Sequence, residues 1–289
     1  MYVPFHTLEN VADVRISQAA ESIDDNGIVI IDNVVPTPVL DTLRERMELD
    51  TSLLLARGAW GGAGQIKGHI QQSPPVTAPF VHETIVSNPV IMPIIREVLG
   101  DGFFMTLYSA NVNTIGSSPQ RPHADAGHLW FNTGVRRKHP IYHPATTLVV
   151  NIPLIDTTPE NGSTEVYLGS HKNTEVEMWV PEALLHKYAC RRANTTKGSV
   201  IIRDIRTWHR GMPNHSTSNR HMIAMIMNVW WLNRAKKNYF HVSARDAFKT
   251  PYFDPNAEFL DVEIDPTSAR EDYFQIPYLF EGRHVHECQ

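Results

Sequence analysis

The sequence predicts a mainly β protein with flanking helices. Apart from a short segment around residues 180–188, helical spacing of apolar residues is confined to about the first 100 residues, whereas residues 101–235 contain strand-like apolar runs separated by turn-rich segments. Twenty prolines spread along the chain disfavour a helical bundle, because proline interrupts helices. No repeat, low-complexity tract or linker divides residues 1–289. We therefore expect a single domain, with a helical N-terminal part to about 100, a β core from about 101 to 235 and a C-terminal extension from about 236 to 289.

The N-terminal part is expected to hold three helices and one strand. The first helical segment stops before Asn26 and Gly27, a typical C-terminal signal. Leu40, Leu43 and Met47 form an apolar stripe on the second. The predicted helices span 15–25, 36–55 and 89–99, with a β-branched strand at 27–32 and an irregular Gly- and Pro-rich loop at 59–79.

The β core is expected to contain four longer strands. Each is a run of apolar and β-branched residues bounded by turn-forming residues. Helical spacing returns only around residues 180–188. The predicted strands span 103–115, 145–155, 198–204 and 221–232.

Composition and charge argue against several classes of function. A formal net charge of −5 and a pI near 6.3 disfavour nucleic acid and anionic membranes as partners, since both require a basic face. Cys190 and Cys288 are too few for a disulfide framework or a cysteine zinc cluster. No signal peptide, transmembrane run or peroxisomal C-terminal signal is recognisable. A cytoplasmic protein that acts on small molecules is expected.

Candidate metal ligands lie in two segments of the β core. His123 and Asp125 are two residues apart, so on an extended chain both side chains project to the same side. His209 follows the predicted strand at 198–204, and Arg220 comes eleven residues later. Two histidines and a carboxylate form the facial triad of non-haem iron(II) oxygenases, which leaves adjacent positions open for a cosubstrate and O2. An arginine suits the distal carboxylate of 2-oxoglutarate, because its planar guanidinium pairs with two oxygens at once.

Motifs around these residues point to a known family. The stretch 159–172 contains an Asn-Gly turn followed by Gly-Ser-His, and the segments 116–120 and 206–211 adjoin the two candidate histidines. In these segments the chain resembles the phytanoyl-CoA dioxygenase family, a branch of the iron- and 2-oxoglutarate-dependent oxygenases. The resemblance covers roughly residues 15–235.

The resemblance implies a double-stranded β-helix core, the jelly-roll or cupin-like fold, with helices packed on one sheet. It implies that iron(II) is held by His123, Asp125 and His209, and that Arg220 anchors 2-oxoglutarate. Halogenating relatives carry a small residue in place of the carboxylate. Because Asp125 is retained, hydroxylation, desaturation or a related oxidation is expected, with release of succinate and CO2.

Five further residues are candidates for contacts with ligands. The resemblance implies that Gln120, Asn151 and Thr147 line the cosubstrate pocket. Trp130 and Phe131 lie in a long predicted loop, 127–144, which is expected to enclose the substrate together with the loop 59–79. By analogy with the family, the substrate is expected to be a small secondary metabolite, and a homodimer is a further expectation.

Two other functions use the same residues. A zinc hydrolase combines three such ligands with a bound water, and a jelly-roll binding module needs no catalysis. Arg220 and the lack of an obvious general base favour the dioxygenase over the hydrolase, and the complete ligand set disfavours a binding module. The remaining histidines of this region are interpreted as packing residues: His128, His139, His143 and the turn residue His171.

Overall fold

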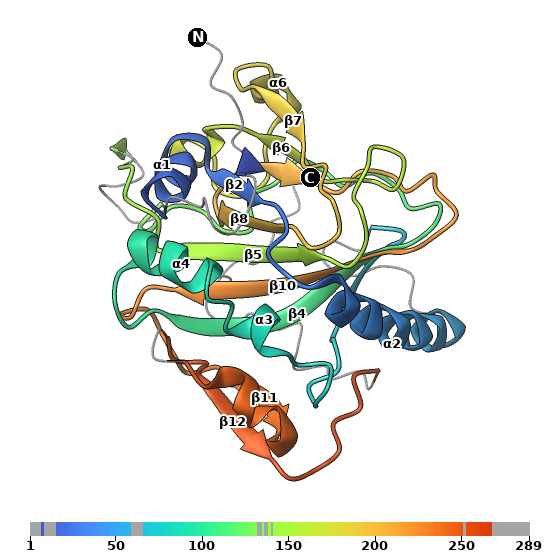
Figure 1. Cartoon of the computed structure of the whole chain (residues 1–289). Helices are drawn as coiled ribbons and strands as arrows, with labels where there is room; N and C mark the ends of the chain where they lie inside the picture. The colour runs from blue at the N-terminus through green and yellow to red at the C-terminus, as the bar shows by residue number, and fades with distance from the viewer. Residues whose placement is uncertain are drawn as a thin grey trace.

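The computed structural model describes residues 7–8, 16–58, 66–131, 135, 138–139, 141–250 and 253–267. These residues form two facing β-sheets, with helices packed on the larger one (Figure 1). The larger sheet has the strand order β1-β2-β8-β5-β10-β4-β3, and the smaller has the order β7-β6-β9. The strands of the larger sheet are β1 (Thr7–Leu8), β2 (Ile28–Ile31), β3 (His69–Gln72), β4 (Phe104–Asn113), β5 (Thr147–Pro153), β8 (Val200–Asp204) and β10 (Arg220–Asn228).

The outer face of the larger sheet carries the main apolar core. Successive side chains of a strand point to opposite faces, and the outward set of the central strands is apolar: Val150 lies opposite Met225 and Ile152 opposite Ile223. Amphipathic helices bury their apolar stripes against this face. The helices are α1 (Ile16–Asn26), α2 (Thr37–Ala56), α3 (Glu83–Val86) and α4 (Ile91–Leu99).

The inner face of the larger sheet looks toward the smaller sheet, which consists of β6 (Glu165–Tyr167), β7 (Cys190–Arg192) and β9 (His209–Arg210). An apolar layer joins the two sheets at one end: Ile28, Ile30 and Ile201 of the larger sheet contact Val166 and Leu168. Two facing sheets built mainly from antiparallel pairs form the jelly roll, so the predicted fold is confirmed.

The described part of the C-terminal extension packs on the edge of the same body. It consists of β11 (Asn238–His241), a 3₁₀ helix η3 (Val242–Phe248) and β12 (Ala257–Leu260). Phe240, Phe248 and Phe253 belong to the main apolar core. A bridge between Phe104 of β4 and Asp254 ties the extension to the larger sheet. The described part of the extension therefore shares the core of the larger sheet, and the single domain stays a prediction.

The structure corrects the prediction in two places. The predicted irregular loop 59–79 contains the edge strand β3, which pairs with the end of β4, while residues 59–65 lie outside the described part. Only Ile70 is apolar in the sequence of β3, so its pairing leaves no strand signal. The helix predicted around 180–188 shortens to α6 (Glu182–Leu185). Within the described residues, no helix is long and apolar enough to cross a membrane.

Candidate metal centre

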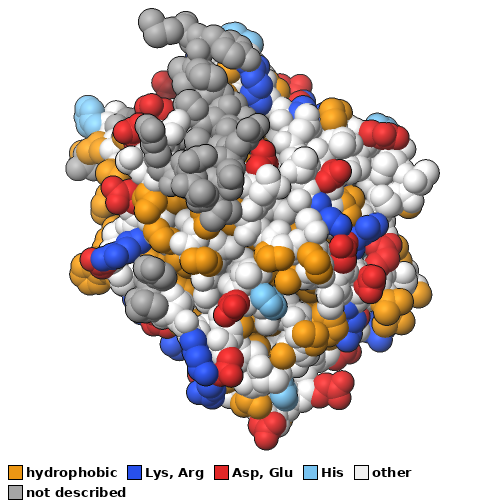
Figure 2. Space-filling model, viewed as in Figure 1, with side chains coloured by type: hydrophobic (Ala, Val, Ile, Leu, Met, Phe, Trp, Pro, Cys, Tyr) orange, Lys and Arg blue, Asp and Glu red, His pale blue; other side chains and the backbone are white. Residues whose placement is uncertain are grey.

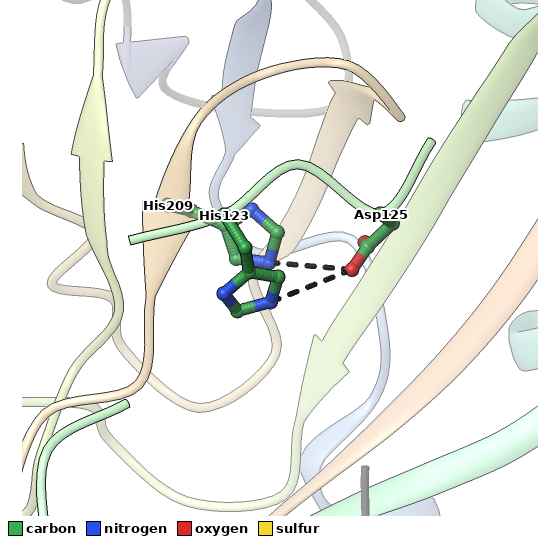
Figure 3. A group of neighbouring side chains, drawn as sticks. All are labelled: His123, Asp125 and His209. Atoms are coloured by element: carbon green, nitrogen blue, oxygen red, sulfur yellow. Dashed lines mark ion pairs between the residues drawn. The ribbon is translucent and has the colours of Figure 1, made fainter. Parts of the chain in front are cut away.

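Three side chains converge between the two sheets (Figure 3). Nε2 of His123 and Nε2 of His209 each lie 3.7 Å from Oδ1 of Asp125. The ligand atoms of all three residues lie within 4.8 Å of one another, and no other such group of three or more occurs among the described residues. The convergence expected from the sequence is therefore present, and its geometry suits a single metal ion.

Backbone pairing brings the two histidines together. His123 and His209 form an antiparallel bridge, with their N–H groups donating to each other's carbonyl oxygens at 2.9 and 2.8 Å. Residues directly opposite each other in an antiparallel pair project from the same face of the sheet. Their ring centroids consequently lie 4.4 Å apart. On its other side, His123 forms a second antiparallel bridge with Trp179. The bridging continues the smaller sheet from His209 of β9 through His123 to Trp179.

A hydrogen bond fixes the tautomer of each imidazole ring. Nδ1 of His123 lies 2.8 Å from the carbonyl oxygen of Arg121, and Nδ1 of His209 lies 3.0 Å from that of Thr207. A carbonyl oxygen only accepts, so each Nδ1 must carry the proton and donate it. Each Nε2 faces Asp125, and in the neutral ring it is the nitrogen that keeps the lone pair. This arrangement is typical of histidines that bind metal through Nε2.

Charges around Asp125 keep its carboxylate ionised. Burial alone raises the pKa of this carboxyl, but the adjacent Arg203 guanidinium holds it well below its usual range. Arg203 also donates a hydrogen bond from Nη2 to Oδ2 of Asp125. Burial and the same guanidinium lower the pKa of His209 to about 3, so its ring stays neutral. A neutral imidazole and an ionised carboxylate are the forms that bind a metal ion.

Arg220 is a buried cation that has no anionic partner among the described residues. It begins β10, opposite Asn113 of β4, and is 3% exposed. Its Nε has no hydrogen-bond partner, and among the described residues its guanidinium reaches only the sulfur of Met222, at 3.8 Å. Burial and the nearby Arg192 lower the pKa of Arg220 to about 10. An unpaired guanidinium inside a protein is costly, and an anionic ligand would offset that cost.

The three residues predicted to line the cosubstrate pocket, Gln120, Asn151 and Thr147, lie at different positions along the barrel axis. Gln120 accepts a hydrogen bond from the N–H of Gly211 through Oε1, at 2.8 Å. A Cβ at position 211 would lie 2.5 Å from Cε1 of His69 and 2.8 Å from that oxygen, so a larger residue there would displace one or both side chains. Asn151 lies opposite Ala224 on the inner face, with its Nδ2 3.4 Å from the carbonyl oxygen of Ile223.

Thr147 lies at the opposite end of β10 from Arg220. It faces Asn228, to which it donates a hydrogen bond of 2.8 Å. Arg220 and Asn228 are the two ends of β10, which separates them by about 26 Å along an extended strand. Arg203 faces Val149, one inner-face position from Thr147. The metal centre therefore lies between Arg220 and Thr147 along the barrel.

The described part of the 127–144 loop is anchored away from the converging side chains. Nε2 of His128 lies 3.0 Å from the carbonyl oxygen of Asn173, and the carbonyl oxygen of His143 accepts from Arg206 at 2.8 Å. Trp130 is 58% exposed, with its ring 6.4 Å from that of His143. Phe131 is half-buried.

The remaining histidines lie outside the converging group. His171 is buried in η2 (Ser170–Lys172), where its Nε2 approaches the carbonyl oxygen of Asp24 at 2.8 Å. His128, His139 and His143 are likewise absent from the group that could hold a metal within the described residues.

Two further residues lie beside the converging side chains and were not predicted from the sequence. Arg203 lies within an apolar run, and only strand alternation would have placed it on the inner face. Trp179 follows a turn-rich segment, and its bridge with His123 joins segments more than fifty residues apart. Its ring centroid lies 5.9 Å from that of His123, and the side chain is 59% exposed.

Comparison with known proteins assigns the family. The family description "Phytanoyl-CoA dioxygenase (PhyH)" matches residues 23–222, which is most of the chain. The chain belongs to the phytanoyl-CoA dioxygenase family. A curated relative, "Iron/alpha-ketoglutarate-dependent dioxygenase ausU" of Aspergillus calidoustus, is 23% identical over 227 residues, covering 75% of this chain and 72% of the relative.

Solved structures share the fold. The structure of HygX from Streptomyces hygroscopicus, with nickel, 2-oxoglutarate and hygromycin B bound, has a TM-score of 0.54 at 14% identity and covers 82% of this chain and 96% of its own. The epimerase SnoN, in complex with Fe3+, alpha-ketoglutarate and nogalamycin RO, has a TM-score of 0.53 at 18% identity, covering 74% of this chain and 83% of its own. At these identities the likeness shows the fold alone.

The family sets the enzyme class. The protein is an iron- and 2-oxoglutarate-dependent dioxygenase, as the sequence predicted, with iron(II) and 2-oxoglutarate as its cofactors and O2 as oxidant. The zinc hydrolase and the non-catalytic binding module are thereby set aside. The roles of individual residues and the substrate are proposals.

Proposed function

We propose that this protein oxidises a small organic secondary metabolite at an iron(II) ion held by His123, Asp125 and His209. The observation that carries the proposal is the convergence of these three side chains, with Nε2 of both histidines facing Asp125 and Nδ1 of both rings bonded to backbone carbonyl oxygens. A buried, unpaired guanidinium on the same inner wall supplies the second requirement, a cation for the cosubstrate.

The residues present fit both groups. The two imidazoles and one carboxylate leave neighbouring positions of the ion open for 2-oxoglutarate and O2. Arg220 would hold the distal carboxylate of 2-oxoglutarate, since the bond offsets the burial of its own charge. When bound, iron(II) and 2-oxoglutarate together supply the oxidising chemistry, with succinate and CO2 as co-products. Retention of Asp125 as a ligand favours hydroxylation, desaturation or a related oxidation over halogenation.

The position of each polar residue along the barrel axis supports a separate role for it. Gln120 lies beside Gly211, close after His209, and Asn151 lies between the levels of Arg220 and the metal centre. Both would line the path of 2-oxoglutarate. Thr147 lies beyond the metal centre as seen from Arg220, so it would face the substrate instead.

Trp179 would supply an apolar wall for the substrate. It projects from the same face of the smaller sheet as His123, its directly opposed neighbour. The Asp125 side chain is one-third exposed and His123 is partly exposed, so solvent reaches the centre, and the exposed Trp179 ring lies 5.9 Å from the His123 ring. An exposed indole there provides a large, rigid contact surface for an organic substrate.

Surface charge supports a small-molecule substrate. On the face shown in Figure 2, Lys and Arg side chains are scattered among Asp and Glu side chains and form no continuous basic surface. A nucleic acid would need such a surface. SnoN and HygX are captured with small organic ligands, nogalamycin RO and hygromycin B, in the same fold. A small secondary metabolite is the substrate class we propose here, and a homodimer stays a prediction.

Succinate formation tests the proposal. Purified protein with iron(II), 2-oxoglutarate and O2 is incubated with a panel of polycyclic, glycosylated and peptide metabolites. We expect at least one class to accelerate succinate release and to gain oxygen or lose hydrogen, as read by mass spectrometry. Hydrolysis of a panel member without consumption of 2-oxoglutarate, and with zinc in place of iron, would support the hydrolase instead.

A further inference from the structure

Arg203 is a buried arginine whose guanidinium forms an ion pair with the carboxylate of Asp125. It lies on the inner face of β8, between Ile28 of β2 and Val149 of β5, and is 6% exposed. Its Nη2 donates to Oδ2 of Asp125, and the described residues offer it no second ion pair. The ion pair therefore connects the larger sheet to the segment that carries the metal ligands.

The two oxygens of Asp125 have different surroundings. Oδ1 lies 3.7 Å from Nε2 of both histidines, at the point where a metal ion would bind. Oδ2 accepts the hydrogen bond from Arg203. A free carboxylate can bind a metal through one oxygen or through both. The guanidinium occupies Oδ2 and repels a cation that approaches it, so only Oδ1 is available to a metal.

We infer that Arg203 is a positioning residue that restricts Asp125 to one metal-facing oxygen and so keeps a coordination position open. The inference rests on the proposed iron site. A carboxylate bound through both oxygens would occupy two neighbouring positions of the ion. Because 2-oxoglutarate needs two positions and O2 a third, the site then has one position too few. Arg203 thus sets the number of external ligands that the centre accepts.

Cobalt(II) binding tests this inference without turnover. The visible absorption of Co(II) reports its coordination, and Co(II)-loaded protein is then titrated with 2-oxoglutarate. We compare the wild type with Arg203→Met, which removes the charge at similar volume, and Arg203→Lys, which keeps it. Arg206→Met is the matched control, because Arg206 is equally buried and ion-paired with Asp204 away from the converging ligands.

The expected pattern separates coordination from stability. Arg203→Met should bind Co(II) at least as tightly as the wild type, since a repelling charge is gone and Oδ2 is free. Its Co(II) spectrum should change before 2-oxoglutarate is added, and its Kd for 2-oxoglutarate should rise at least about tenfold. Arg203→Lys should restore the wild-type spectrum. Arg206→Met should unfold more easily but keep both the spectrum and the 2-oxoglutarate affinity.

Three results would overturn the inference. One is a wild-type spectrum and wild-type 2-oxoglutarate affinity in Arg203→Met. Another is loss of Co(II) binding in both Arg203→Met and Arg206→Met, which would make the ion pair merely structural. If Arg203→Met does not fold, Arg203→Gln replaces it and should show smaller changes in the same direction. Failure of the wild type itself to bind Co(II) would overturn the proposed function, and this inference with it.

Discussion

Replacing Arg220 by methionine should raise the stability of the ligand-free protein and abolish its stabilisation by 2-oxoglutarate. Burial and the neighbouring Arg192 lower the pKa of Arg220 to about 10. One pKa unit corresponds to about 1.36 kcal/mol, so lowering the pKa of Arg220 from the ordinary arginine value to about 10 means that burying its charge costs the folded protein about 3 kcal/mol. Because the folded-state pKa lies below the unfolded one, this cost is present at all pH values below about 10 and fades only as the pH rises through that value.

The charge-free variant escapes this cost, so its free energy of unfolding without ligand should rise by up to about 3 kcal/mol. The Arg220→Met substitution also removes the proposed partner of the distal carboxylate of 2-oxoglutarate. Losing a buried, hydrogen-bonded charge pair costs about 2–5 kcal/mol, which weakens 2-oxoglutarate binding about 30- to 4,000-fold. Affinity for the organic substrate should change far less.

Urea unfolding with and without 2-oxoglutarate, on manganese-loaded protein, measures both effects. Arg206→Met is the matched control. Arg206 is also 3% exposed, but its guanidinium is paired with the buried Asp204. Removing it leaves that carboxylate unpaired and should destabilise the protein by about 3–5 kcal/mol. Equal destabilisation by both methionine variants, with 2-oxoglutarate binding intact in Arg220→Met, would refute the reasoning.

The remaining predictions concern the metal and the substrate. Alanine at any one of the three proposed ligands should abolish iron binding and succinate formation while the protein stays folded, as read by metal analysis and circular dichroism; full activity in any of them would remove that ligand from the site. Trp179→Ala should weaken substrate binding and raise the ratio of succinate to oxidised product, whereas Trp179→Phe should retain most coupling. Trp130→Ala and Phe131→Ala should uncouple the two half-reactions in the same way if their loop encloses the substrate, with iron and 2-oxoglutarate binding nearly intact; coupled turnover at wild-type substrate affinity in both would reduce the loop to packing.

The order of the longer elements could be predicted from the sequence because burial leaves an apolar pattern in each of them. Residues 147–153 and 220–228 lie in the centre of the larger sheet, buried on both faces, and read as near-continuous apolar runs. The edge strand β3 could not be predicted this way. Its sequence, HIQQ, places polar side chains toward both the barrel interior and α2, where Gln72 bonds with Thr51.

That His123 and Asp125 project to the same side followed from their spacing, whereas His209 was placed with them by the family resemblance. What spacing could not supply is the set of contacts made across the sheets. Arg203 meets Asp125 only because two sheets face each other, and Trp179 meets His123 only through a bridge between distant segments. The pairing register likewise decided the place of Thr147, which shares a face with Asn151 but lies at the end of the barrel far from Arg220.

Anaerobic titration of the protein with iron(II) and then 2-oxoglutarate tests the central claim most directly. Chelation of iron(II) by the keto and carboxylate oxygens of 2-oxoglutarate produces a visible charge-transfer absorption band. We predict that this band saturates at one iron and one 2-oxoglutarate per chain, and that it is lost in His209→Ala. Absence of the band in the wild type, or an unchanged band in that variant, would contradict an iron centre built from His123, Asp125 and His209.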